Sequence, residues 1–532
     1  MRKLSNILLA SAALALPFTL NACNSNDDGD GSGGEGGDNP SDGGKGNGAG
    51  GKGTGGNTGG KGSVGGQGTV GGQGGDLGGQ GGDVSVGGTG TETGGSATGG
   101  SGPTIVPCEG ESCVAAAETC WDEGGPGTAL VESGRGAFSA NTSWLEGWTN
   151  WDTESSGVGN TTPDEMLSDD IDADMTLTAD KVWGIDGYVH VLDGATLTIE
   201  PGTVIKGAPG ASVLIISRGG KIQAVGTKDA PIVFTSMDDD GDKAPGEWGG
   251  LVLLGRASNW QGGNVAIEGI GSPGESDQYG PGDTDGTTTT WDDESSGELK
   301  YVRIEFGGIE LSAGKEINGL TLGSVGSGTK ISYVEVNTTL DDCFEWFGGK
   351  VNANHIVCNG DGDDSFDVDQ GWRGTIDTAF SRKLFNPSSD PNGLEWDSSL
   401  ANKTPVTSAH IKHATLCGFG PDYGPVGSTN LSYGFLLREG VTGSIEDVFQ
   451  NGFELVVDAR DSFGTNEDPN MTIEGVVAVQ TLGEAIILPE TKIVPDDYAD
   501  QGACVLAYDC DDDSSFDEEA WFDAGEGNQF LN

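Results

Sequence analysis

A short motif recurs through the second half of the chain, and its spacing constrains the fold more than any other feature. The motif is a small or amide residue, then an apolar residue, then often an acid, and its middle copies begin at Asn318, Asp342, Asp364 and Asn392, at intervals of 24, 22 and 28 residues. A propeller blade needs roughly 40 residues and four strands, whereas a period in the low twenties is typical of a coil of parallel β-strands. We therefore expect an all-β chain that folds as a single-stranded right-handed parallel β-helix, in preference to a propeller or a sandwich.

Neighbouring coils of such a solenoid stack their inward side chains into one continuous core. Apolar and polar residues begin to alternate at about residue 175, and Asp-Gly and Pro-Gly turns interrupt the alternation, a pattern typical of short strands. We predict that the β-helix spans residues 175–490. Its inward column should be formed by the apolar residues of successive motifs, namely Leu320, Phe344, Phe366, Leu394 and Phe453.

The N-terminus carries an export signal. Basic residues at positions 2 and 3 precede an apolar stretch, 7–20, that is too short for a stable membrane span. It ends in Leu20-Asn21-Ala22-Cys23, which resembles the lipobox of bacterial lipoproteins, in which the cysteine is acylated and becomes the new N-terminus. This resemblance implies a signal peptide at 1–22 and a lipid anchor on Cys23, with enough acyl chains for stable membrane attachment. Asn24 is not the Asp of an inner-membrane retention signal, so we expect the outer membrane, and the cell surface of a Gram-negative bacterium.

The segment after the lipobox is dominated by glycine, which supplies 97 of the 532 residues of the chain. Residues 23–103 contain almost no large apolar side chain and cannot offset the entropy of ordering, so we expect a disordered tether. Residues 104–174 form a Cys- and Trp-containing lead-in without a recognisable pattern, and residues 491–532 form an acidic C-terminal segment. The formal net charge of −57 excludes nucleic acid as a partner, because clustered Lys and Arg carry phosphate binding.

Eight cysteines remain when Cys23 is set aside. An even number in an exported chain favours disulfides, and Cys504 with Cys510 is the easiest pair to propose because a short loop joins them. Zinc is the alternative, but the chain has no paired CxxC motif and only four histidines. We therefore expect up to four disulfides.

Several segments together are similar to a family of exported bacterial β-helix proteins, frequent in Bacteroidetes and mostly of unassigned function. They include DGATLTIEPGTVIKG, GEWGGLVLLGRA, LKYVRIEFGG, LDDCFEWFGGKVNANHIV and GDDSFDVDQGWRG. The resemblance implies the fold and export but no activity. Cys343 stands where similar proteins usually carry Gly, and this departure implies a disulfide to Cys358 in the adjoining coil.

Acidic residues concentrate between positions 341 and 397. Because adjacent coils lie about 4.8 Å apart, carboxylates at equivalent positions would form columns, and their repulsion calls for raised pKa values or a bound cation. Ca²⁺ is the natural cation for such oxygen ligands. The alternative is a set of solvated acids and Asx turns at coil corners. The candidate ligands are Asp341, Asp361, Asp363, Asp367 and Asp369.

The segment GDGDDSFD also resembles the Asp pair of polygalacturonase-type hydrolases, in which one carboxylic acid protonates the leaving oxygen and another activates water. The resemblance implies catalytic roles for Asp342, Asp363 and Asp364, with Arg373 holding an anionic sugar, although the further Gly-His-Gly and Arg-Ile-Lys motifs of those enzymes are absent. A lyase would instead use a Lys or Arg base beside calcium. Three tryptophans could stack on sugar rings or pack in the core: Trp346, Trp372 and Trp396.

The sequence favours a non-catalytic role, in which a lipid-anchored acidic β-helix serves adhesion or carbohydrate binding with the help of calcium. The first alternative is a polysaccharide hydrolase or lyase that uses the acids of 341–369. The second is a structural surface protein without a specific ligand. The net charge of −57 would repel polyuronates unless calcium bridges them.

Overall fold

The structure is a computed structural model. It describes residues 120, 125–126, 136–138, 143–270, 273–312, 315–384, 391–399, 403–419, 432–453, 455–460 and 471–479. The expected signal peptide (1–22), the linker (23–103) with Cys23, the C-terminal segment (491–532) and the pair Cys504 and Cys510 lie outside these residues. Within the described part of the chain, no helix has the length and apolar character needed to cross a membrane.

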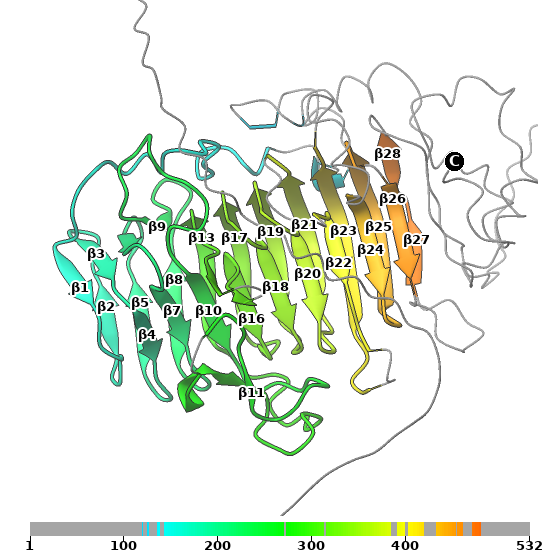
Figure 1. The fold of residues 1–532 in the computed structure, drawn as a ribbon, viewed down its shortest axis with the longest axis horizontal. Coiled ribbons are helices and arrows are strands. Elements are labelled where there is room, and N and C mark those ends of the chain that lie inside the picture. Colours follow the sequence, from blue (N-terminus) through cyan, green and yellow to red (C-terminus); the bar gives the residue numbers. More distant parts are fainter. Residues whose placement is uncertain are drawn as a thin grey trace, which may run out of the picture. The chain divides into compact units, whose positions relative to one another are not determined.

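The strands pair in parallel along a solenoid, as the motif spacing predicts (Figure 1). The larger sheet has 15 strands. Their bounds are β1 (Glu165–Leu167), β2 (Met175–Leu177), β3 (Val182–Ile185), β5 (Thr196–Ile199), β6 (Val204–Gly207), β8 (Lys221–Val225), β9 (Ile232–Ser236), β13 (Gly297–Glu305), β17 (Lys330–Asn337), β19 (Asn352–Asn359), β21 (Thr375–Arg382), β23 (Ser408–Cys417), β25 (Thr442–Asn451), β27 (Met471–Glu474) and β28 (Val477–Val479).

A second parallel sheet of nine strands forms another face of the solenoid (Figure 1). Its strands are β4 (Tyr188–Val191), β7 (Val213–Ile216), β10 (Gly250–Leu254), β16 (Leu320–Gly323), β18 (Phe344–Phe347), β20 (Phe366–Asp369), β22 (Leu394–Trp396), β24 (Tyr433–Arg438) and β26 (Leu455–Arg460). The chain alternates between the two sheets, so each strand pairs with the strand one coil earlier and the strand one coil later.

The larger sheet is bent, so that a coil has three faces. The first part of β13 pairs with β8 and the later part pairs with β9, and Tyr301 between them has a φ of 49°. Tyr333 and His355 repeat this positive φ at the equivalent positions of β17 and β19. The fold is therefore an all-β right-handed parallel β-helix with two or three short strands per coil.

The inward column confirms the register predicted from the repeat. Phe344 in β18 pairs with Leu320 in β16 on one side and with Phe366 in β20 on the other, and Phe366 pairs with Leu394 in β22. All four side chains are fully buried.

The prediction that Phe453 is the last member of the column is wrong. Phe435 in β24 pairs with Leu394, and Val457 in β26 pairs with Phe435. Phe453 is buried but precedes the first residue of β26. Gly452 and Phe453 of the motif in this last coil therefore lie between β25 and β26 and not in a strand.

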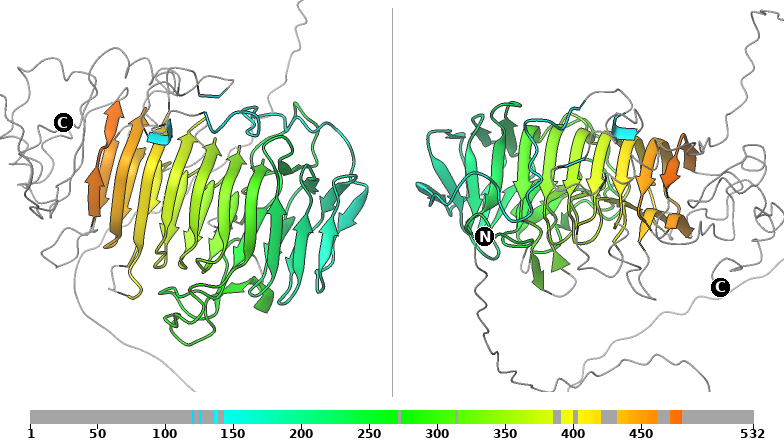
Figure 2. Two further views of the ribbon diagram at one scale, coloured as in Figure 1. Left: turned by 180° about the vertical axis from the view of Figure 1, so that it is seen from behind. Right: turned by 90° about the horizontal axis from the view of Figure 1, so that it is seen from above.

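Short strands and 3-10 helices lie outside the two parallel sheets. Two antiparallel pairs, β11 (Val265–Ala266) with β12 (Gln278–Tyr279) and β14 (Glu310–Ser312) with β15 (Lys315–Glu316), belong to loops. The loop with β11 and β12 also contains the 3-10 helix η2 (Glu275–Asp277) and projects from the solenoid in Figure 1. A second 3-10 helix, η1 (Gly136–Phe138), comes from the lead-in and packs on β23. Figure 2 shows the lead-in, in cyan, running along the strands of the larger sheet.

Candidate functional site

Carboxylates form a column on the outer face of the nine-stranded sheet. Glu345 in β18 pairs with Asp367 in β20, which pairs with Glu395 in β22. Each lies directly after an inward aromatic or leucine residue of the core column, so strand alternation turns it outward. The expected column of acids at equivalent coil positions is present.

A second column lies in the turns that lead into these strands, and we call it the turn ladder: Asn318, Asp342, Asp364 and Asn392. One side-chain oxygen of each later member accepts the backbone N–H of the next coil. Asp342 Oδ1 accepts from Asp364 N at 2.8 Å, Asp364 Oδ1 accepts from Asn392 N at 2.6 Å, and Asn392 Oδ1 accepts from Tyr433 N at 3.0 Å. The ladder thus satisfies the backbone N–H groups of three successive turns.

The side-chain amides of the turn ladder also donate hydrogen bonds, which its ionised carboxylates cannot do. Asn392 Nδ2 donates to Glu395 Oε2 at 3.0 Å, and Asn318 Nδ2 donates to Glu345 Oε2. An ionised carboxylate has only acceptor oxygens. Asp342 and Asp364 therefore bring a further negative oxygen to the positions where an asparagine would bring a donor.

Four acids gather around Asp342, and we call the five residues the acidic cluster: Asp341, Asp342, Glu345, Asp363 and Asp367. The carboxylate oxygens of Asp341, Asp342 and Asp363 lie within 4.8 Å of one another, and so do those of Asp342, Glu345 and Asp367. Asp342 belongs to both groups. Beside them, Asn318 is fully buried and its Oδ1 has no hydrogen-bond partner among the described residues.

Burial dominates the electrostatics of this cluster. Loss of water raises the pKa of Asp341, Asp342, Glu345 and Asp367 well above their ordinary values, and the neighbouring acids raise these pKa values further. The same causes raise the pKa of Asp364. Such a cluster is relieved only by protons or by a cation. Its oxygen-only donor set, amide oxygen included, is the set that Ca²⁺ takes.

Asp361, an expected calcium ligand, does not join the cluster. Its Oδ1 lies 2.9 Å from Lys383 Nζ, and both side chains are fully buried. Its Oδ2 accepts a hydrogen bond from Ser365 Oγ at 2.6 Å. A lysine therefore neutralises Asp361, so the expectation that Asp361 binds calcium is wrong.

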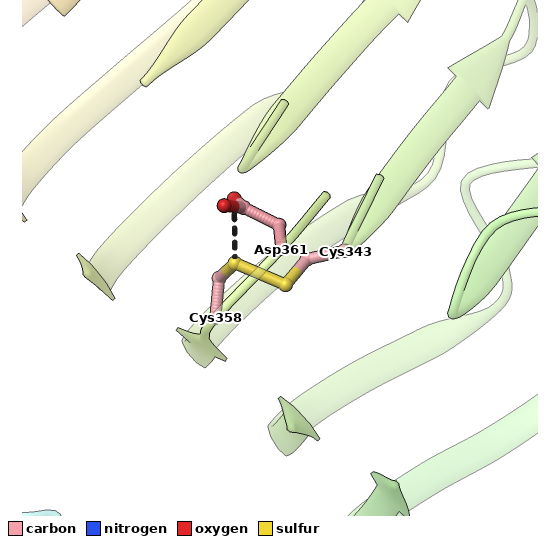
Figure 3. Close-up of side chains that lie close together, drawn as sticks. All are labelled: Cys343, Cys358 and Asp361. Carbon is pink, nitrogen blue, oxygen red and sulfur yellow. Dashed lines mark hydrogen bonds between the residues drawn. A yellow bond between two sulfur atoms is a disulfide. The ribbon is translucent and has the colours of Figure 1, made fainter. Parts of the chain in front are cut away.

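Figure 3 shows Asp361 beside the disulfide between Cys343 and Cys358, with Asp361 Oδ2 lying 3.0 Å from Cys358 Sγ. The expected pairing of Cys343 with Cys358 is thereby confirmed. The bond joins the turn before β18 to the end of β19 and is fully buried. It braces the coil that carries the acidic cluster.

Asp369, the remaining expected ligand, lies two residues after Asp367 on the same face. With Asp397 and Arg438 at the equivalent positions of the next two coils it forms a second column, which we call the outer row. Burial, together with Asp397 and Glu439, raises its pKa to about 7. Arg438 at the end of β24 donates to Asp397 Oδ1 at 2.8 Å and also to Glu395. Burial raises the pKa of Glu395 to about 7, with Arg438 opposing this shift and Asp397 adding to it.

The four expected catalytic residues do not converge. Asp342 and Asp364 are only 6% and 3% exposed, and their oxygens hold the turn ladder. Arg373 follows the opposite end of β20, where its Nη2 donates to Ser258 Oγ at 2.6 Å and lies 3.7 Å from Asp292 Oδ2. The length of β20 separates Arg373 from Asp363, so the expected grouping of Arg373 with these acids is wrong.

The expected sugar platform is also wrong, because Trp346, Trp372 and Trp396 are all fully buried. Trp346 lies two residues after the inward Phe344 and therefore points inward too. Its ring packs on that of Trp372, with 5.3 Å between the centroids. Among the described tryptophans, Trp291 in the loop before β13 is the large exposed one, at 42%.

Sequence reasoning missed the role of Arg438 as the cation of the outer row. The repeated motif does reach this coil through Gly434 and Phe435. Counting three residues on from Phe435 gives Arg438, and three residues on from Leu394 gives Asp397. The signal was therefore available in the repeat itself.

Searches of curated proteins and of solved structures find no match. A family described as the pectate-lyase like beta helix domain matches residues 169–486, which is more than half of the 532-residue chain. The matched region includes the acidic cluster, the turn ladder and the outer row with Arg438. The chain therefore belongs to the pectate-lyase-like β-helix domain family.

Proposed function

We propose that this chain is a lipoprotein, anchored to the outer membrane through Cys23, whose β-helix binds carbohydrate at the cell surface with the help of calcium. The membership in the pectate-lyase-like family supports a carbohydrate ligand or substrate. The lipobox, the Gly-rich tether and the resemblance to exported Bacteroidetes proteins support the location. The composition of the turn ladder is the observation that carries the calcium part of the proposal.

The turn ladder needs an oxygen acceptor at each step, and asparagine supplies one. Asn392 accepts from the next turn and at the same time satisfies Glu395. At Asp342 and Asp364 the chain uses a carboxylate for the same acceptor role. Because an amide would serve the fold without any like-charge repulsion, the extra negative oxygens are better explained by a ligand that needs them.

A calcium ion fits this ligand requirement. It takes six to eight oxygen ligands in flexible geometry, whereas magnesium demands a near-ideal octahedron. The acidic cluster offers carboxylates from two coils, and the side-chain amide of Asn318 lies beside them, with its nitrogen donating to Glu345. Hydroxyl or carboxylate oxygens of a bound glycan would complete the coordination, and the ion would offset the repulsion between an acidic glycan and an acidic protein.

Retention of the full-length protein on a panel of insoluble neutral and uronate-containing glycans tests this proposal. We expect retention in 1 mM calcium and its loss in chelator. Asp342→Asn and Asp364→Asn should lose the calcium-dependent retention, while Glu446→Gln, which removes one exposed acid from the outer side of β25, should keep it. Retention that ignores calcium would contradict the calcium part, and no retention on any glycan would contradict the carbohydrate part.

A polysaccharide hydrolase or lyase is the second candidate, because two carboxyl groups on this face, Asp369 and Glu395, have a pKa of about 7. A group with this pKa can act as a general acid near neutral pH, and Asp397, which Arg438 contacts, would be the partner carboxyl group. Assays for new reducing ends and for unsaturated uronate absorbance test this candidate. Product formation that Glu395→Gln abolishes would support it, and no product from any glycan would remove it.

A further inference from the structure

The lead-in contains a segment, residues 143–160, that we call the strap. It crosses the outer face of the larger sheet from η1, beside the yellow strands, back toward the first coil (Figures 1 and 2). Its direction is opposite to the order of the coils. The N-terminal segment thus reaches the solenoid at β23 and only later forms β1.

Aromatic packing holds the strap and η1 to this face. The ring centroid of Trp148 lies 5.8 Å from that of Tyr301 and 6.0 Å from that of Tyr333, in edge-on geometry. Phe138 of η1 lies 6.1 Å from Phe380 of β21. Trp148 and Phe138 are 1% and 0% exposed. The strap and η1 are therefore part of the packed structure, with the strap covering β13 and β17 and η1 covering β21.

Side chains from five strands also donate to main-chain carbonyls of the strap. All five donors are buried or nearly buried, so the strap satisfies polar groups that would otherwise lack these partners. The bonds are Lys206 Nζ to Gly159 O (2.9 Å), Arg303 Nη2 to Ser156 O (2.7 Å), Asn337 Nδ2 to Asp152 O (2.9 Å), Asn359 Nδ2 to Asn150 O (3.2 Å) and Arg382 Nη2 to Trp151 O (3.5 Å).

A disulfide between Cys120 and Cys417 fixes the chain just before the strap to the last residue of β23. The two cysteines are 297 positions apart in the sequence. The loop that this bond closes contains the strap and every residue of the turn ladder, the acidic cluster and Asp397. Arg438 and Glu439 lie beyond it.

We infer that the Cys120–Cys417 disulfide and the strap form a mechanical clamp that protects the ligand-binding coils from tension on the N-terminus. Tension that enters at Cys120 passes through the covalent bond to β23 and does not reach the strap or strands β1 to β22. Without the bond, tension would peel the strap and then the first coils. In a solenoid each terminal coil is held only by its neighbour, so peeling proceeds coil by coil.

This inference rests on the proposed function in one respect: a protein that is tethered by its N-terminus and holds a surface ligand experiences such tension. The clamp also explains why the lead-in runs against the coil order. A tether attached at β1 would load the edge of the solenoid, whereas one attached at β23 loads a strand that is paired on both sides, with β21 and β25.

Single-molecule stretching of the full mature chain between its two termini tests the clamp. The shielded 297 residues correspond to a length of about 1,000 Å at ~3.5 Å per residue. We expect Cys120→Ser/Cys417→Ser to extend about 1,000 Å further than wild type. It should also show an early step of about 150 Å as the segment from Cys120 to β1 peels, and wild type should lack this step.

Cys343→Ser/Cys358→Ser is the matched control, because its disulfide lies inside the shielded loop, and it should reach the wild-type length. Cys120→Ser alone leaves β23 unaltered and should behave as the Cys120/Cys417 double variant does. Equal final lengths for wild type and the double variant would overturn the inference. A double variant that opens without the early step would also overturn it, because the strap would then not be a separate unit.

Calcium binding in solution, without tension, separates this test from that of the proposed function. Cys120→Ser/Cys417→Ser should bind calcium as wild type does, because the acidic cluster is formed by β18, β20 and their preceding turns. If wild type fails to bind calcium but still stretches to a shorter final length than the double variant, the calcium proposal is overturned and the clamp is not.

Discussion

Replacement of Asp342 by asparagine separates a structural role of this residue from a ligand-binding role. Asp342 is 6% exposed, and its Oδ1 accepts the N–H of Asp364 at 2.8 Å. The amide of an asparagine keeps this acceptor and can donate toward Glu345, as Asn392 donates to Glu395. The substitution therefore removes one buried carboxyl group and keeps the hydrogen bond from the N–H of Asp364.

In chelator we expect Asp342→Asn to stabilise the protein. The substitution converts a contact between two carboxyl groups into a hydrogen bond from an amide to a carboxylate, and a bond to a charged group contributes about 1.5–3 kcal/mol. A gain of about 2 kcal/mol corresponds to a rise of about 4 °C in Tm at roughly 2 °C per kcal/mol for a large domain. Burial and the neighbouring acids, which raise the pKa of Asp342, are the source of the gain.

In calcium the order should reverse. A ligand at 100 times its Kd stabilises the protein that binds it by about 2.7 kcal/mol, and the variant lacks a carboxylate shared by both groups of the acidic cluster. Thermal melts of wild type, Asp342→Asn and Glu446→Gln at pH 7.5, with calcium and with chelator, measure both effects. Equal calcium stabilisation of wild type and Asp342→Asn would refute the assignment of Asp342 as a ligand, and destabilisation of the variant in chelator would refute the electrostatic argument.

Three further predictions concern the same face. Because Asp369 and Glu395 have a folded-state pKa of about 7 against ordinary values of 3.8 and 4.5, the native state retains protons that the unfolded state has lost, and stability should fall as the pH rises from about 4 to about 7. Melts in chelator should show a lower Tm at pH 8 than at pH 5, and a flat profile would contradict the raised pKa values of Asp369 and Glu395. Arg438→Gln removes the cation between Glu395 and Asp397. It should lower the free energy of unfolding by about 2 kcal/mol at pH 8, a small loss for a broken ion pair because Arg438 is 30% exposed. Urea unfolding measures this loss, and much of it should be recovered at pH 5. Phe366→Ala empties a fully buried site and should cost about 3–5 kcal/mol, and a loss below 1 kcal/mol in urea unfolding would place Phe366 outside the core column.

The repeat predicted the fold and the register because both follow from one period. Once Phe344 and Phe366 occupy the same position in neighbouring coils, Glu345 and Asp367 must also be neighbours. The same parity determines that Trp346 points inward with Phe344, so core packing, one of the two alternatives left open for this tryptophan, was readable from the sequence. The disulfide between Cys343 and Cys358 was anticipated from the resemblance, because Cys343 stands where similar proteins usually carry Gly.

Contacts that depend on the exact path of turns and loops were not predictable. The strand length of β20 carries Arg373 away from Asp363, and Lys383 reaches Asp361 only because both side chains are enclosed. The lead-in gave no pattern, because the strap is not a coil of the solenoid and therefore does not follow its period. Cys120 and Cys417 are 297 positions apart, and no spacing rule relates two such residues.

The sequence by itself determined that this chain is a solenoid with an acidic outer column, because a period of about two dozen residues places every side chain relative to its counterpart one coil away. The tertiary structure alone decided which acids share a site, which are neutralised by lysine or arginine, and where the N-terminal segment attaches to the coils. Those outcomes depend on the burial of individual atoms and on contacts between remote segments, and neither is encoded in a local period.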